Sequence, residues 1–158
     1  MKRAPSRRQV QPGLVAEIKT PRGLAYLQYV RRDPEYGEMI RVLSGVFSER
    51  PEDIDKLVAA PELYVVFFPF GAALRQEIIS AVSSAPIPAA GWRERAMRRP
   101  GGRAKDGRIL NWVVSEGGRD RVVKELSESE RKLSIATIVN DTLLIDRIAS
   151  GWLPEVET

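Results

Sequence analysis

The sequence predicts an α+β fold in which antiparallel strands predominate, with an SH3-like meander extended into a larger curved sheet and short C-terminal helices. Three observations support this prediction. Residues 14–43 contain three strand-like segments joined by short turns. A Gly117-Gly118 pair separates two further strand-like segments, as in a β-hairpin. A Ser-x-x-Glu pattern at residues 127–130 marks the start of a helical region.

The first three strands are predicted at residues 14–19, 24–31 and 38–43, where apolar and polar residues alternate in part. Turn-forming residues rich in Pro and Gly separate them, at 20–23 and 33–37. Short connections allow consecutive strands to pair antiparallel. A three-stranded meander of this kind curls readily into an SH3-like half-barrel.

The longest apolar run of the chain, residues 62–70, is predicted to be the central strand. It is rich in β-branched and aromatic residues, and Pro61 and Pro69 lie at its two ends. Such a run is typical of a strand that is buried on both faces. Because proline has no backbone N–H to donate, the strand should end at Pro69 or lie on an edge there.

Two segments flank this strand. Residues 48–58 are predicted to form a short helix, with Pro51 at its first position and acidic residues after it. Residues 72–88 fit two interpretations, because some apolar residues recur at helical spacing whereas the stretch 78–82 has the composition of a strand.

The C-terminal part is predicted to contain a hairpin followed by helices. The hairpin strands are residues 109–114 and 119–124. Ser134 and Asp141 are candidate caps for the turns that follow the first capping box. Gly151 has the position of a residue that ends the last helix.

A length of 158 residues is typical of a single domain, which we place at residues 12–155, behind a disordered basic tail at residues 1–11. The chain is 43% hydrophobic and 29% charged, which is enough to bury a core. No apolar run approaches the roughly 20 residues of a membrane span, and no apolar segment follows the basic N-terminus as in a signal peptide. We therefore expect a cytoplasmic protein that does not contact membranes.

The chain contains no cysteine and no histidine. This composition excludes disulfides and thiolate zinc sites, and it excludes zinc hydrolases and Ser-His-Asp enzymes that depend on histidine. The glycines at residues 101–107 lack the spacing of a phosphate-binding loop. We expect no enzymatic activity, no cofactor and no metal.

The net charge of +4 is unevenly distributed. Residues 1–8 carry four basic groups and no acid, and residues 93–108 carry seven basic groups and two acids, which leaves −5 for the rest. Both segments are either solvated chain or contacts for phosphate or an acidic partner. Residues 89–108 show no clear periodicity, and Trp92 and Met97 are the candidates for anchoring them.

The candidate partner-binding residues are aromatic residues and arginines. Trp92 with Arg93 and Arg95 beside it has the composition of an interface hot spot, although a Trp can equally be a packing residue. Tyr26 and Tyr29 are three positions apart on one predicted strand and therefore point to opposite faces. This spacing predicts that one of the two tyrosines is exposed.

Three further residues have two interpretations each. Trp112, on a predicted strand, is most simply a core residue, with an interface anchor as the alternative. Arg147, on the final helix, can pair with an acid of the same chain or face a partner. Asp141 is interpreted as a helix cap rather than as an acid-base group.

Four features spread over residues 12–155 occur in a familiar order. They are Pro12-Gly13 followed by an aromatic strand at 26–30, residues 66–69 followed by 84–88, residues 111–114 followed by a glycine turn, and the closing runs 126–135 and 140–152. In this order the chain resembles the immunity protein 26 family of bacterial polymorphic-toxin systems. The closing runs are the most specific of the four.

The resemblance implies a small β-rich α+β domain that binds and neutralises a cognate toxin protein of the same cell lineage, without a cofactor. It also implies a turn at residues 71–75 and a strand at 76–84. Immunity proteins against nucleases are often acidic. The basic segments therefore imply that an acidic face binds the toxin, or that the toxin is not a nuclease.

The alternative is a nucleic-acid-binding module. In this hypothesis the basic N-terminal tail and the loop at residues 93–108 bind the phosphate backbone, beside the SH3-like meander. Binding to a phosphate backbone should weaken steeply as the salt concentration rises. Occlusion of a toxin by a partly apolar patch should depend much less on salt.

Overall fold

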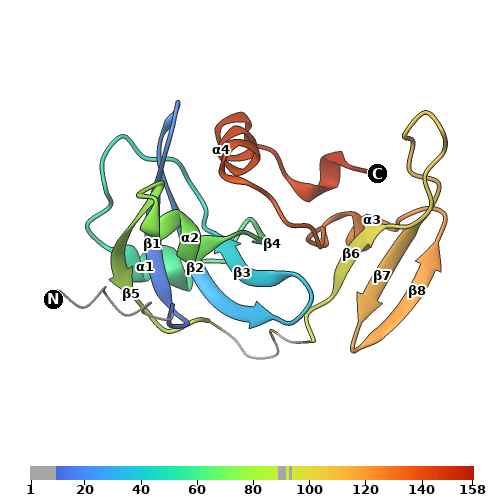
Figure 1. Cartoon of the computed structure of the whole chain (residues 1–158), viewed down its shortest axis with the longest axis horizontal. Helices are drawn as coiled ribbons and strands as arrows, with labels where there is room; N and C mark the ends of the chain where they lie inside the picture. The colour runs from blue at the N-terminus through green and yellow to red at the C-terminus, as the bar shows by residue number, and fades with distance from the viewer. Residues whose placement is uncertain (1–9, 89–91, 93) are drawn as a thin grey trace, which may run out of the picture.

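The computed structural model describes residues 10–88, 92 and 94–158. Within these residues, eight strands form two antiparallel sheets, with the strand orders β4-β3-β2-β1-β5 and β6-β7-β8. Figure 1 shows the second sheet to the right of the first, with α4 and the C-terminal chain above them. The predicted α+β class, rich in antiparallel strands, is confirmed.

The predicted meander forms the middle of the first sheet. Its strands are β1 (Leu14–Thr20), β2 (Gly23–Asp33) and β3 (Gly37–Val42), each paired antiparallel with the next. Gly23 and Gly37 begin β2 and β3 with φ angles of 136° and 89°, a conformation that side chains other than glycine rarely adopt. The two turns therefore lie where the Pro and Gly signals predict them.

Strand β4 (Tyr64–Phe67) is buried on both faces as predicted, but it lies at the edge of the sheet and not at its centre. The connecting segment 134–139 covers its outer edge. The backbone N–H of Val65 donates to Ser134 Oγ at 2.9 Å, and Phe67 exchanges backbone hydrogen bonds of 3.1 and 2.9 Å with the same segment. The prediction that β4 is central was wrong because its outer edge is buried by a segment that is distant in sequence, and not by another strand.

Helix α1 (Ile54–Ala59) begins later than the sequence predicts. Asp53 is its N-cap, and its carboxylate accepts a hydrogen bond of 3.0 Å from the backbone N–H of Lys56. Pro51 therefore precedes the helix instead of occupying its first position. An Asp that bonds the orphan N–H groups of the first turn determines the start more strongly than a proline does.

The ambiguous segment after β4 contains both of the structures that its pattern allows. Residues Phe70–Arg75 form the helix α2, which corrects the turn expected at 71–75. Residues Ile79–Ser84 form β5, which pairs antiparallel with β1 at the other edge of the sheet. Glu77 lies between them with a φ angle of 59°, so the chain turns sharply there.

The second sheet consists of β6 (Met97–Pro100), β7 (Trp112–Glu116) and β8 (Arg119–Val123). The glycine hairpin between β7 and β8 is confirmed, with φ angles of 57° at Gly117 and 75° at Gly118. Strand β6 was not predicted, because its residues show no apolar alternation.

The C-terminal helices are α3 (Glu128–Arg131) and α4 (Asp141–Ser150), followed by a 3₁₀ turn at Pro154–Val156. The capping box of α3 is confirmed, with Ser127 as its N-cap. Gly151 ends α4 with a φ angle of 71°, as predicted. The prediction that Asp141 caps α4 is wrong by one position, because the N-cap is Asn140.

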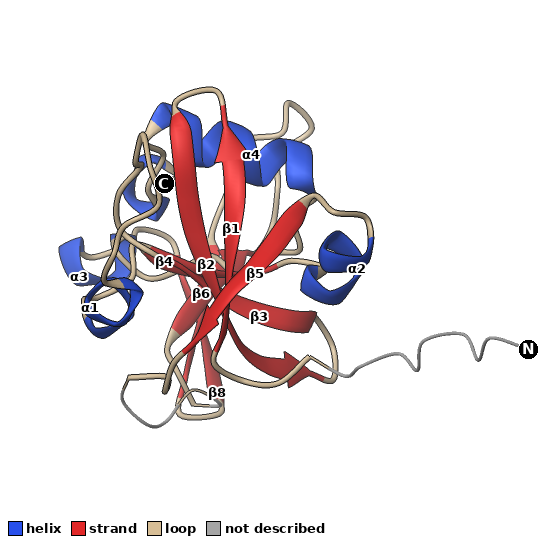
Figure 2. Cartoon of the chain, turned by 90° about the vertical axis from the view of Figure 1, so that its left-hand side faces the viewer, coloured by secondary structure: helices blue, strands red, loops and turns tan. Residues whose placement is uncertain are grey.

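Helix α4 helps to cover the larger core. Figure 2 shows it running across the strands of the first sheet. Its fully buried Leu144 belongs to the same apolar cluster as Ile18 of β1, Leu27 of β2 and Phe68 after β4. The helix therefore joins the C-terminal part of the chain to the meander.

Asn140 caps α4, because its Oδ1 accepts a hydrogen bond of 2.8 Å from the backbone N–H of Leu143. We expect Asn140→Ala to lower the free energy of unfolding by about 1 kcal/mol. Asp141→Asn changes only a charge near the positive end of the helix and should cost a few tenths of a kcal/mol. Urea unfolding of the two variants compares them. Equal losses, or a larger loss for Asp141→Asn, would contradict this assignment.

Candidate functional site

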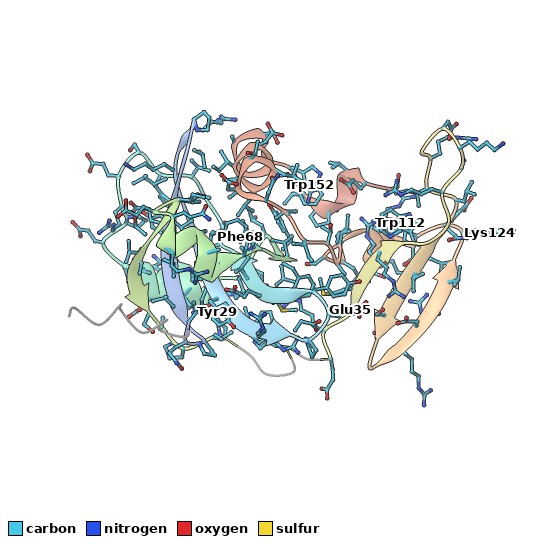
Figure 3. All side chains as sticks on the ribbon, in the orientation of Figure 1. Tyr29, Glu35, Phe68, Trp112, Lys124 and Trp152 are labelled. Atoms are coloured by element: carbon cyan, nitrogen blue, oxygen red, sulfur yellow. The ribbon has the colours of Figure 1, made fainter. Side chains whose placement is uncertain are left out.

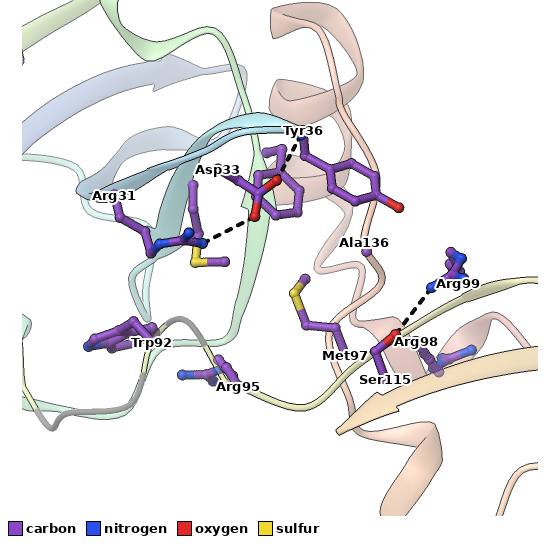
Figure 4. A pocket seen from close by; sticks show the side chains of 12 residues that line it. Arg31, Asp33, Tyr36, Trp92, Arg95, Met97, Arg98, Arg99, Ser115 and Ala136 are labelled. Carbon is purple, nitrogen blue, oxygen red and sulfur yellow. Dashed lines mark hydrogen bonds and ion pairs between the residues drawn. The ribbon is translucent and has the colours of Figure 1, made fainter. Parts of the chain in front are cut away.

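A cavity of about 120 Å³ lies between the two sheets. Residues of β2, the β2–β3 turn, β3 and β4 line one side. The other side is lined by Trp92, Arg95, Met97, Arg98, Arg99 and Ser115 (Figure 4). Arg31, Arg95 and Arg99 contribute guanidinium groups to it, and Trp92 and Tyr36 contribute aromatic rings. We call this cavity the arginine cavity.

Arg31 reaches the cavity from the end of β2. The pairing of β2 with β3 shifts its register between Tyr29 and Arg31. A bulge of this kind changes the direction in which a strand residue points. Arg31 Nη1 donates a hydrogen bond of 3.3 Å to Asp33 Oδ2, at the point where β2 ends and the β2–β3 turn begins.

Asp33 organises this turn. Its Oδ1 accepts hydrogen bonds from the backbone N–H groups of Glu35 at 2.8 Å and Tyr36 at 3.0 Å. Burial favours the neutral carboxyl, but these N–H groups and the Arg31 guanidinium outweigh it, so the pKa of Asp33 is lowered. Asp33 is therefore ionised at neutral pH. The turn also holds the Tyr36 ring stacked on Phe67, with centroids 4.7 Å apart.

Arg95 and Trp92 form the second wall. The Arg95 guanidinium lies 4.7 Å from the centroid of the Trp92 ring, and its Nη2 bonds Glu62 Oε2 at 3.3 Å. The Trp92 indole N–H donates to the backbone oxygen of Pro88 at 3.2 Å. Glu62 also accepts from buried Arg41, so one carboxylate connects the cavity to the first sheet.

Arg99 comes from β6 and bonds across to the hairpin. Its Nη1 donates to Ser115 Oγ at 3.1 Å, and its Nη2 bonds Asp120 Oδ2 at 2.9 Å. Ser115 Oγ in turn donates to Asp120 Oδ1 at 2.6 Å. The Ser115 hydroxyl and the Arg99 guanidinium lower the pKa of Asp120, which keeps this carboxylate ionised. The network holds the Arg99 side chain in position.

The three guanidinium groups keep donors available for a partner. A guanidinium has five N–H donors. Within the described residues, Arg31 and Arg95 each bond one carboxylate and no other acceptor. The side chains of Arg31, Arg95 and Arg99 are 20%, 34% and 37% exposed, so a partner can reach them. The cavity therefore offers hydrogen-bond donors to an anion such as a carboxylate.

Arg98 borders the same cavity but points to the other face of β6, where it is 1% exposed. Its guanidinium lies 4.1 Å from the centroid of the Trp112 ring, and its Nη2 donates to the backbone oxygens of Pro154 and Arg131. Burial lowers the pKa of Arg98. Trp112 is only 2% exposed. The structure thus assigns Trp112 to the core and corrects its candidacy as a partner-binding residue.

The candidacy of Tyr26 and Tyr29 as partner-binding residues is also corrected. Both are buried, with exposures of 0% and 6%, so the prediction that one is exposed is wrong. They belong to two different apolar clusters, as expected for opposite faces of β2. Tyr26 donates a hydrogen bond of 2.8 Å to Glu17. The face of β2 that carries Tyr26 is covered by the α1 region. The periodicity of a strand does not reveal such a cover.

The remaining candidates are separated in space. Arg147 lies on α4, where it bonds Glu157 at 3.3 Å and stacks on Trp152, in a second cavity. Arg93 and residues 1–9 of the tail predicted at 1–11 lie outside the described residues. Val10 is described, and it packs against the larger apolar cluster. Of the predicted group, Trp92 and Arg95 lie together, with the Arg95 guanidinium over the Trp92 ring. That they bind a partner stays a prediction.

Sequence reasoning missed Arg31 and Tyr36, and it counted Arg99 only as part of a basic segment. The turn signal at residues 33–37 could have indicated Tyr36, because Asp33 is typical of a turn that exposes its neighbours. No sequence pattern indicates that residues of β2 and β6 line one cavity.

Searches against family models, curated proteins and solved structures found no match. None of the helices in the described part of the chain has the length and apolar character that crossing a membrane requires. Among the same residues, no three carboxylates come together as a metal-binding group.

Proposed function

We propose that this protein is a cytoplasmic, non-enzymatic immunity protein of the immunity protein 26 type, which binds and neutralises a cognate bacterial toxin. The arginine cavity carries this proposal. Three arginines from separate elements, with Trp92 and Tyr36, surround one partly exposed cavity. Arginine and tryptophan are the residues most enriched at the energetic centres of protein interfaces. The resemblance in the order of motifs is the second support.

The size of the cavity favours one side chain of a partner. A volume of about 120 Å³ corresponds to roughly four water molecules of the liquid, at about 30 Å³ each. An Asp or Glu side chain is small enough for such a space. Guanidinium groups bind carboxylates through two parallel hydrogen bonds, which gives geometric specificity. We infer that an acidic side chain of the toxin enters the cavity and that contacts around its rim complete the interface.

Nucleic-acid binding is the alternative, and the loop between β6 and β7 is the observation in its favour. Arg103, Lys105 and Arg108 are exposed there. Asp106 pairs with Arg108 at 2.7 Å, which leaves two of these three charges without a carboxylate among the described residues. Such a loop could contact a phosphate backbone.

The proposal predicts that the neighbouring reading frame encodes a protein with a toxic domain, and the test uses this domain as the binding partner. We expect Trp92→Ala and Arg95→Ala each to weaken binding of this domain by about thirtyfold and to reduce protection of cells that express it. Arg119→Ala is the matched control, because Arg119 lies exposed on β8 without a side-chain partner in the described chain. Calorimetry measures the affinities.

Two outcomes would contradict the proposal. If both variants bind the toxin domain as tightly as the wild type, the arginine cavity is not the binding site. If the wild type does not bind this domain but binds a short DNA duplex with an affinity that falls steeply with salt, the nucleic-acid hypothesis is correct.

A further inference from the structure

Strand β8 forms one end of the second sheet. It pairs with β7 on one side, and within the described residues no backbone segment pairs with its other side. Figure 1 shows it at the right-hand end of the molecule, away from the first sheet. The opposite end of the sheet is covered, because residues 134–136 exchange backbone hydrogen bonds with Arg98 of β6. An uncovered strand edge is a template for pairing with another strand.

The hairpin determines which backbone groups of β8 point away from β7. Its two glycines have positive φ angles, as in a two-residue turn whose flanking residues, Glu116 and Arg119, lie opposite each other. The flanking residues of such a turn bond each other, and residues along an antiparallel strand alternate in the direction of their backbone groups. The backbone groups of Asp120 and Val122 therefore point to the free side of β8.

Three exposed side chains occupy alternate positions along this edge, and alternate positions of a strand share one face. Val122 is 67% exposed. Asp120 accepts from Arg99 and Ser115, but its side chain is 53% exposed and its carboxylate can accept a further hydrogen bond. Lys124, directly after β8, is exposed and has no ion-pair partner in the described chain. Figure 3 shows it at the right-hand end of the molecule.

The order of acid, valine and lysine is complementary to itself. When Val122 lies opposite Val122 of an antiparallel second copy, Asp120 of each copy lies opposite Lys124 of the other. A shift of one residue would place outward backbone groups opposite inward ones. A shift of two residues places Arg121 opposite Arg121 in one direction and Val122 opposite Lys124 in the other. Both shifts lose the two pairs of opposite charge, so the sequence selects one register.

We propose that two copies of this chain associate through antiparallel pairing of their β8 strands, which joins the two three-stranded sheets into one. Val122 lies opposite Val113 of β7, so the valines of both copies form one apolar row across the joined sheet. A strand this short buries less area than the roughly 1,200 Å² of a stable interface, so the dimer should exchange with the single chain as concentration changes. This inference does not depend on the proposed binding of a toxin.

Sedimentation of the full chain at low salt, where exposed charges are least screened, measures the association. We expect the apparent mass to rise with concentration from 17.7 kDa toward twice this value. Lys124→Asp and Asp120→Lys each place like charges opposite each other at two symmetric positions, and each should weaken self-association about tenfold. A mixture of the two variants restores both attractions, so the variants should bind each other about as tightly as the wild type binds itself.

Lys105→Asp is the matched control, because it makes the same change of charge on the exposed loop between β6 and β7 and should associate like the wild type. The proposal is overturned if the wild type sediments as a single chain up to about 1 mM. It is also overturned if both charge variants of the β8 edge associate like the wild type, or if their mixture associates no better than each variant alone.

Discussion

Replacing Arg41 by alanine is expected to lower the free energy of unfolding by about 3–5 kcal/mol. Arg41 lies on β3 and is 1% exposed. Its Nη1 donates to Gln28 at 2.6 Å, its Nε to Glu62 at 2.9 Å and its Nη2 to the backbone oxygen of Ala60 at 2.9 Å. Removing the guanidinium leaves these three acceptors in a poorly solvated region with one partner fewer. That loss, rather than the net strength of the ion pair, makes the effect large.

Urea unfolding of Arg41→Ala and of the exposed control Arg119→Ala measures this difference. The control should stay within about 0.5 kcal/mol of the wild type. A loss below about 1 kcal/mol for Arg41→Ala would show that water replaces the guanidinium without difficulty and would contradict the expectation.

The same variant should change the dependence of stability on pH. Burial alone would raise the pKa of Glu62, but Arg41 and Arg95 outweigh it, so the pKa is lower in the folded state. The stabilisation from ionised Glu62 is therefore complete above the unfolded pKa of about 4.3 and is lost as pH falls through the folded value. The difference in stability between wild type and Arg41→Ala should shrink as pH falls below about 4. A difference that stays constant as pH falls below about 4 would show that Glu62 does not carry it.

Replacing Trp112 by alanine is the second large effect, with an expected loss of about 3–5 kcal/mol. Trp112 is 2% exposed on β7 and packs in one cluster with Val114, Leu126 and Ile135. Its ring also faces the buried Arg98 guanidinium. Alanine would leave a cavity in the smaller core and remove the stacking partner of a buried charge.

Trp92→Ala is the matched comparison, because Trp92 is only partly buried and lies at the arginine cavity. It should reduce stability much less than Trp112→Ala, while it weakens the proposed toxin binding. Denaturant unfolding and the binding assay together separate the two tryptophans. If Trp112→Ala proved as stable as Trp92→Ala, the packing role of Trp112 would be wrong.

The sequence by itself determined the features that depend on neighbours in the chain. Glycines that adopt positive φ angles place the turns of the meander and of the β7–β8 hairpin. Ser127 and Glu130 satisfy each other's backbone groups and so start α3 where the pattern predicts. The apolar run of β4 predicts its burial on both faces. Each of these features follows from backbone sterics or hydrogen bonding within a few residues.

Only the tertiary structure decided which elements meet. β4 lies at an edge because residues 134–139 cover it, and β6 is a strand because β7 pairs with it. The arginine cavity likewise joins Arg31 to Arg95 and Arg99, although they are more than sixty positions apart. Local periodicity carries no information about such contacts. They arise when separate apolar faces pack together and when buried or partly buried charges such as Arg41 and Glu62 find partners elsewhere in the chain.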